Sequence, residues 1–427
     1  MARYDRIARI AAPAREDCFR GWLTLRDIDG REREPELGRR ARLRFLALRP
    51  VRRLLLRGLG GPAADSLQAQ LDEVRREIDR LDARDPERDR LMAYLAEAGG
   101  RSPLGLATAT LEVGAAAEGA GHRFAAEEFY RTGLELAREH DLPAHQVRAL
   151  RRIARVHRGR EEWDRAVDVG HEAASLADSL GEPVQWARAM DEVARAESAR
   201  GNRDAARAIL EAVAARGVAA ADRLVRAVAA GALCDLELAA GNVEAALREG
   251  LAAVELFPVT DPHRNAALLA MAAALRRVGL WSAAEACYGV VETHSTWVEH
   301  RAEAATERAV LAAELGDTAA FTRRRARILR TLESGDLRLR ALLHLGLGRG
   351  CLVAGHVDHA REHLRQAIAS ARDGDMDTLL DPADALLHAL EAGKPLPRVR
   401  PGPASAASRA LAEEITQRFG AEVAAGA

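Results

Sequence analysis

The chain has 427 residues, of which 48% are hydrophobic and only 4% aromatic, and its formal net charge at pH 7 is −1. It contains no apolar run of about eighteen residues and no signal peptide, so we expect a cytoplasmic protein. Its four cysteines lie far apart without a CxxC pair, which argues against a disulfide framework. Of the 63 basic residues only Lys394 is a lysine, a usage that indicates a bacterial, GC-rich source.

Residues 1–60 form a basic N-terminal arm with sixteen arginines against eight acidic residues. Its segment 37–57 combines eight arginines with leucines and no acid, and Pro50 divides it into two short helices. Such a segment can lie on an anionic membrane, contact a partner protein or bind a nucleic acid, and the first two are favoured over nucleic acid. The interpretation that we favour over these contacts is that its apolar side docks on the first helices while its arginines face the acidic remainder. The arginines concerned are Arg39, Arg40, Arg42, Arg44, Arg52 and Arg53.

Residues 61–102 are predicted to form a helical lead-in. An apolar stripe runs through it with alternating spacings of four and three, as in a helix with one buried face. The stripe consists of Leu67, Leu71, Val74, Ile78 and Leu81. It spans little more than two heptads, too short to indicate a coiled coil, so it either packs on the first repeat or mediates self-association. The oligomeric state stays open.

Residues 103–374 contain a pattern that returns seven times at about forty residues. Small residues recur before and after a turn, and such residues let two antiparallel helices approach closely. The slot before the turn reads Gly114, Ala154, Ala194, Cys234, Ala272, Ala309 and Gly348. The slot after it reads Ala126, Ala166, Ala206, Ala246, Ala284, Phe321 and Ala360. Self-similarity at this period predicts stacked helical hairpins.

Helix-start signals return at the same period. An acidic or hydroxyl cap followed by proline marks the first turn of a helix. These signals are Ser102-Pro103, Asp141 with Pro143, Glu182-Pro183, Asp222, Asp261-Pro262 and Asp336. Two independent patterns with one period therefore predict helical pairs.

The small slots around a turn resemble the tetratricopeptide repeat, in its forty-residue, long-helix variant from bacterial signal-transduction regulators. The resemblance implies a right-handed α-solenoid of about seven hairpins that binds proteins and is not an enzyme. The aromatic slots of the family are mostly lost here, with only Trp163 and Trp281 where a tyrosine is usual. Phe321 occupies an alanine slot in the sixth unit, where we expect a packing irregularity.

Residues 375–427 are expected to cap the array. A closing helix is predicted over 377–392, a proline-rich spacer over 394–403, and a short polar helix over 405–420. A tail of this composition is typical of a mobile segment, with or without a motif for a partner.

One string looks catalytic. His359, Glu362 and His363 match HxxEH, the inverted zinc-protease motif. However, Ala360 is already a small slot of the seventh unit, and the third ligand that the motif needs has no good candidate. No phosphate-binding loop or nucleophile motif is present either. We therefore expect no catalytic residues, no metal and no cofactor.

The resemblance also implies a groove, because the first helix of each pair lines the concave face of such arrays. Its inward slots are basic in the second and third units and acidic in the first and sixth. The basic ones are Arg148, Arg151, Arg152, Arg155, Arg158, Arg188 and Arg195. The acidic ones are Glu112, Glu118, Glu303, Glu307 and Glu314. The basic set resembles the carboxylate clamp of chaperone-binding repeats, although the asparagines of that clamp are missing.

The sequence thus predicts a non-enzymatic scaffold or adaptor that binds an acidic peptide or protein segment through the groove arginines. A second interpretation is a regulatory sensor array whose basic arm contacts an anionic membrane or nucleic acid. A third is that the groove arginines are an ordinary solvated face, paired with neighbouring acids such as Asp191 and Glu192.

Overall fold

The structure, a computed structural model, describes residues 43–44, 46–48, 50–51, 64–81, 83, 85–100, 102–332, 337–373, 376–393 and 401–426. All the regular elements in these ranges are α-helices, and none is long and apolar enough to cross a bilayer. The chain divides into two compact units. One comprises Met1–Glu192 with Asp375–Asp377, and the other comprises Val193–Gly374 with Thr378–Ala427.

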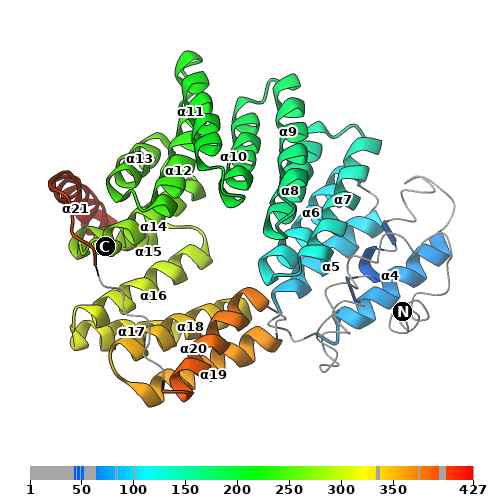
Figure 1. Cartoon of the computed structure of the whole chain (residues 1–427). Helices are drawn as coiled ribbons and strands as arrows, with labels where there is room; N and C mark the ends of the chain where they lie inside the picture. Colours follow the sequence, from blue (N-terminus) through cyan, green and yellow to red (C-terminus); the bar gives the residue numbers. More distant parts are fainter. Residues whose placement is uncertain are drawn as a thin grey trace. The chain divides into compact units, whose positions relative to one another are not determined.

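The helices of the first unit follow one another along the chain (Figure 1). They are α4 (Ala64–Ile78), α5 (Pro86–Gly100), α6 (Pro103–Ala120), α7 (Arg123–Glu139), α8 (Pro143–Gly159) and α9 (Trp163–Ser179). The unit boundary falls inside the next helix, α10 (Pro183–Ala199).

The second unit continues the series with helices of similar length. They are α11 (Arg203–Ala219), α12 (Arg223–Ala240), α13 (Val243–Leu256), α14 (Pro262–Arg277), α15 (Trp281–His294), α16 (Val298–Glu314), α17 (Thr318–Leu332), α18 (Leu337–Val353) and α19 (Val357–Asp373). Two C-terminal helices follow, α20 (Asp377–Glu391) and α21 (Ala406–Gly426).

Seven helical pairs, from α6–α7 to α18–α19, occupy the described part of residues 103–374. This confirms the tetratricopeptide-like array of helical hairpins. Asp141 does not cap α8, because Leu142 is the N-cap there and Asp141 takes the left-handed conformation (φ 51°), and Asp336 lies outside the described residues. Other expected helix starts are present: the side chain of Ser102 accepts a hydrogen bond from Gly105 N. Asp222 and Asp261 cap α12 and α14 in the same way. At many of the described junctions between helices the chain turns through one left-handed residue, such as Gly201 (φ 101°), a conformation that favours glycine.

The fourteen small-residue slots are all buried, because they are the points where neighbouring helices cross. A Cβ on Gly114 would lie 2.7 Å from Cε1 of Tyr130, and one on Gly348 would lie 2.8 Å from Cδ2 of Leu364. A larger residue at either glycine therefore requires the neighbouring side chain to move. The small residues therefore recur along the sequence wherever two helices approach each other closely, once in each repeat.

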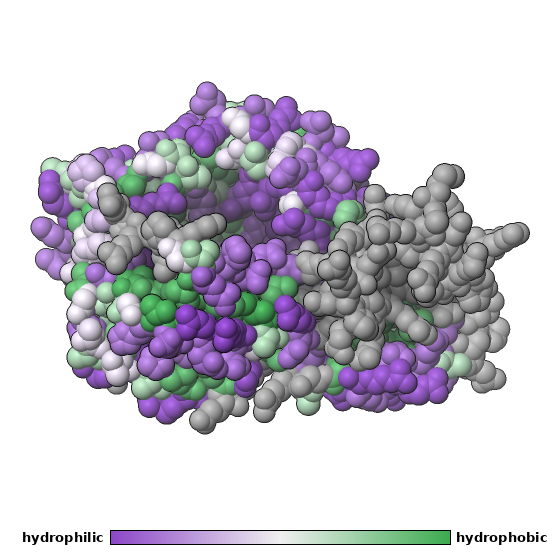
Figure 2. Space-filling model, turned by 60° about the horizontal axis from the view of Figure 1, so that its bottom comes forward, coloured by the Kyte–Doolittle hydropathy of each residue, from purple (hydrophilic) through white to green (hydrophobic). Residues whose placement is uncertain are grey.

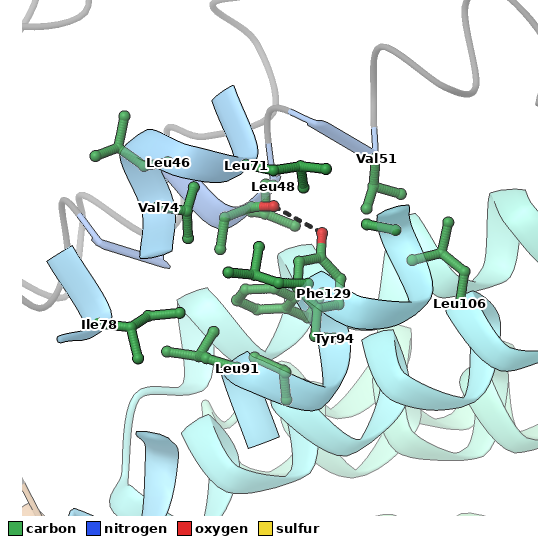
Figure 3. Close-up of a cluster of buried hydrophobic side chains, with 14 of the residues drawn as sticks. Leu46, Leu48, Val51, Leu71, Val74, Ile78, Leu91, Tyr94, Leu106 and Phe129 are labelled. Carbon is green, nitrogen blue, oxygen red and sulfur yellow. Dashed lines mark hydrogen bonds between the residues drawn. The ribbon is translucent and has the colours of Figure 1, made fainter. Parts of the chain in front are cut away.

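The lead-in helices complete the core of the first unit (Figure 3). The predicted stripe of α4 is buried from Leu67 to Ile78 and packs against α5, α6 and α7. The hydroxyl of Tyr94 on α5 donates to the carbonyl of Ala47 over 2.7 Å. Its ring meets the ring of Phe129 edge-on at 6.1 Å between centroids. The stripe thus packs within this chain. The boundary of the lead-in region at residue 61 stays a proposal.

The C-terminal helix α21 is longer and better packed than the sequence predicted. It lies along α15 and α13 (Figure 1). Ile415 and Phe419 are fully buried, and Val423 is so close to Gly289 that a Cβ there would lie 3.0 Å from its Cγ2. Glu422 forms an ion pair of 2.9 Å with Arg264 of α14. The expectation of a mobile tail is therefore wrong for residues 401–426, since their apolar side is part of the second unit's core.

Candidate functional site

Six of the seven predicted groove arginines lie in the first unit. Five are carried by α8, and the sixth, Arg188, is on α10. The seventh, Arg195, belongs to the second unit, where its Nη2 lies 2.8 Å from Oδ2 of Asp235 on α12. The structure therefore assembles a basic face from α8 and the start of α10, which we call the α8 face.

Three of these arginines form ion pairs with α6. Arg155 forms a two-pronged ion pair with Glu118, with Nε–Oε1 at 2.5 Å and Nη2–Oε2 at 2.7 Å. The hydroxyl of Tyr130 donates to the same carboxylate over 2.6 Å, and Arg152 lies 3.6 Å from it. Burial raises the pKa of Glu118, but these donors and positive charges outweigh burial, and the net pKa is lowered. Arg148 pairs in turn with Glu112 of α6.

The predicted acidic slots of the second unit form the same kind of ladder. Arg276 of α14 pairs with Glu307 and Glu314 of α16, and Arg349 of α18 pairs with Glu307 over 2.6 Å. Burial, and the nearby Glu307, raise the pKa of Glu303. Charged side chains of successive first helices thus neutralise one another. Sequence reasoning identified both sets of residues but missed their pairing, although partners such as Glu112 and Arg148 are 36 positions apart, close to one repeat.

Two arginines on the α8 face form no ion pair with a carboxylate in the part of the chain that the structure describes. Nη1 of Arg151 donates to the amide oxygen of Gln185 over 2.8 Å, and its Nε is buried without a hydrogen-bond partner. Nε of Arg188 is buried and unpartnered too, and among the described residues this side chain has no ion pair. Burial, partly offset by Glu192 and reinforced by Arg188, lowers the pKa of Arg151 to about 10. The positive charge there is only partly compensated.

The remaining carboxylates of this face are few. Glu192 lies 3.6 Å from Arg158, whose own Nε is also buried without a partner. Asp191 is close enough to Arg151 to oppose the lowering of its pKa. Since six arginines of the α8 face meet four carboxylates from α6 and α10, the face keeps a positive excess.

The HxxEH string on α19 does not assemble a metal site. Its second histidine, His363, turns to His344 of α18, with 3.1 Å between their Nδ1 atoms. His359 instead lies beside His356, with ring centroids 6.0 Å apart. In the ranges that the structure describes, no group of three or more His, Cys, Asp or Glu side chains is arranged to hold a metal ion. Burial lowers the pKa of both His344 and His363 to about 4.

The cysteines are spread through the repeats. Cys234, Cys287 and Cys351 are free and buried, and Cys18 lies outside the described residues. Burial raises the pKa of the Cys234 thiol to about 12, which keeps it protonated and unreactive at neutral pH. Cys234 serves as a small residue at a crossing between helices.

One arginine of the N-terminal arm is described. Arg44 is only 2% exposed and forms a two-pronged ion pair with Glu87 of α5, with Nε–Oε1 at 2.7 Å and Nη2–Oε2 at 2.9 Å. Leu43, Leu46 and Val51 are buried beside it. Arg44 is therefore not available to a membrane or to nucleic acid. Arg39, Arg40, Arg42, Arg52 and Arg53 lie outside the described residues, so their role stays a prediction.

Comparison with known proteins finds similarity to solved structures only. No family model matches, and no curated protein matches. The apo form of RapI is 10% identical, with 62% of this chain and 98% of that chain covered and a TM-score of 0.40. The apo form of the quorum sensor NprR from B. thuringiensis is 12% identical (80% and 97% covered, TM-score 0.33). A Rap protein complexed with Competence and Sporulation Factor is 10% identical (90% and 99% covered, TM-score 0.35).

Proposed function

We propose that this protein is a non-enzymatic adaptor that binds an acidic peptide or protein segment on the α8 face. The observation that carries the proposal is the state of Arg151 and Arg188, two neighbouring arginines that are partly desolvated and lack a carboxylate partner. A buried donor without a partner is costly, and a bound carboxylate would relieve that cost. Guanidinium groups bind carboxylates through two parallel hydrogen bonds, which gives such contacts geometric specificity.

The acids on the same face favour a peptide over nucleic acid. Glu118 and Glu192 lie among the arginines, where they would repel a continuous phosphate backbone. A peptide carries its carboxylates at separate positions and can place them beside Arg151 and Arg188 while its neutral residues pass the glutamates. The proposal needs no metal, cofactor or catalytic group.

The test is binding of a fluorescent peptide of ten alternating Glu and Ala residues, followed by fluorescence anisotropy. The variant is Arg151→Gln/Arg188→Gln, because glutamine removes the charge and keeps a polar side chain. Loss of two charge-assisted contacts of about 1.5–3 kcal/mol each should weaken binding at least about a hundredfold. Added salt should weaken binding by the wild type in the same direction.

The matched control is Arg165→Gln, which removes an arginine that is 71% exposed on α9, away from the α8 face. It should bind the peptide as the wild type does. A second control is the same peptide with Gln in place of Glu, which should not bind. Equal binding by the wild type and the double variant would refute the proposal and leave the α8 face as a solvated surface.

A further inference from the structure

A hollow in the second unit is not explained by peptide binding on α8. It has a volume of about 360 Å³ and lies between α16, α17 and α18, with the end of α15 at its edge. Its apolar wall includes Ala302, Ala305, Ile328, Leu339 and Leu343. Apolar residues also reach the surface of the second unit, between hydrophilic ones, on the left of Figure 2. This volume lies in the range of pockets that hold small molecules.

The hollow exists because the sixth helical pair is irregular, as Phe321 predicted. Its ring fills an alanine slot and lies against α18, where a Cβ on Gly350 would be 2.9 Å from Cε2. At the same time α16 packs more extensively on α18 than on its own hairpin partner α17. Gly346 permits this, since its missing side chain makes room for Thr306. With α16 and α18 in direct contact, the rest of α17 is left covering a space.

The rim of the hollow is strongly basic, with Arg301, Arg323, Arg324 and Arg327. Arg323 is exposed and has no ion pair among the described residues. Arg301 donates to a backbone carbonyl, that of Ser295, over 2.9 Å. Of these four arginines, only Arg324 and Arg327 form ion pairs with carboxylates among the described residues.

Those two carboxylates are shared with a further arginine. Arg324 lies 2.5 Å from Glu285, and Arg327 lies 3.3 Å from Glu292. Both glutamates also pair with Arg308. Among the described residues, two carboxylates therefore face five arginines at this site, which leaves a positive excess at the mouth of an apolar hollow.

We propose that this hollow binds a small amphipathic anion, namely a carboxylate on a short aliphatic chain. The aliphatic part of the ligand would pack against Ala305 and Ile328, and its carboxylate would bind Arg323 and Arg327 at the mouth of the hollow. Apolar area removed from water supplies affinity, while the planar guanidinium groups select the anionic head. This site lies in the second unit and does not depend on the peptide proposal for the α8 face.

The probe is decanoate, titrated calorimetrically into the intact protein below its micelle-forming concentration. 1-Decanol supplies the chain without the charge, and acetate supplies the charge without the chain. Decanoate should bind at least tenfold more tightly than either. The variant Arg323→Gln/Arg327→Gln should weaken decanoate binding at least tenfold and leave the weak binding of decanol unchanged.

Arg330→Gln is the matched control, because this exposed arginine lies on α17 outside the hollow. It should bind decanoate as the wild type does. Ala305→Phe, which fills the hollow, should abolish binding; should it fail to fold, the arginine variants still decide. Equal affinity for decanoate and decanol, no binding of decanoate, or equal loss in the Arg330 control would each overturn the proposal.

Discussion

Gly346 of α18 lies directly against Thr306 of α16, so that a Cβ on Gly346 would stand only 2.4 Å from the Cβ of Thr306. The threonine cannot rotate away easily, because its hydroxyl donates to the carbonyl of Ala302 over 3.0 Å. This contact fixes the distance between α16 and α18, and with it the position of the hollow beneath α17.

Gly346→Ala should therefore destabilise the protein by about 1–3 kcal/mol through overpacking, although alanine favours helices over glycine. Gly420→Ala on α21 is the matched control, since nothing lies within 4 Å of the added Cβ. It should be neutral or stabilising. Denaturant unfolding measures both changes, and equal behaviour of the two variants would contradict the close contact.

Larger residues at the small slots should act in the same way elsewhere in the array. Ala206 and Ala246 are 0% exposed, and replacing either with leucine should cost about 1–3 kcal/mol. Ala212→Leu, at an exposed position of α11, should change the free energy of unfolding by less than about 0.5 kcal/mol. Thermal melting curves would show the difference, and wild-type melting of the buried variants would mean that the crossings are placed wrongly.

The pair of His344 and His363 should make stability depend on pH. Burial lowers the pKa of each to about 4, and the nearby positive charges of Arg340 and Arg325 act in the same direction, against Glu362. Between pH 6.5 and 4 the unfolded chain therefore binds protons that the folded chain does not. The contribution is fully present above pH 6.5 and is lost as the pH falls toward 4.

Between pH 7 and pH 5 the wild type should lose roughly 2–4 kcal/mol more than the variant His344→Leu/His363→Leu, in which nothing titrates at this position. Urea unfolding at the two pH values gives the comparison. Identical losses in both proteins would place the acid sensitivity elsewhere.

The C-terminal helix should contribute substantially to the second unit. Phe419 is 0% exposed on α21, and Phe419→Ala should cost about 3–5 kcal/mol or release the helix. Gln417→Ala, at an exposed position two residues away, should have little effect. Limited proteolysis would detect release as early cleavage after residue 400. Equal resistance of both variants would show that α21 adds little.

The repeat architecture could be predicted from the sequence because its cause is local and periodic. Crossings between helices are marked by small residues such as Ala206 and Ala246. Helix starts are marked by capping residues such as Ser102 and Asp222. Neither signal depends on residues that are distant in the sequence. Phe321 showed in the same way where the packing would be irregular. A residue that departs from a strong repeat pattern indicates where the packing of the repeats is irregular.

The features that could not be predicted depend on contacts between distant residues. The apolar side of α21 is short, and its partners on α13 and α15 lie more than a hundred positions earlier. The α8 arginines were visible, but the difference between Arg155, which Glu118 neutralises, and Arg151, which no carboxylate contacts, depends on side-chain directions. Phe321 located the irregular unit, but the hollow itself depends on the close packing of α16 on α18, which involves residues such as Thr306 and Gly346, 40 positions apart.

The return of α21 to α13 and α15 also affects the order in which the protein can fold. Arrays of hairpins fold quickly because their contacts are local, and each pair can form as it leaves the ribosome. Here, Arg264 and Glu422 are 158 positions apart in the chain. The surface that receives Ile415 and Phe419 therefore stays uncovered until α21 has been synthesised, and during that interval it is open to chaperones and to aggregation.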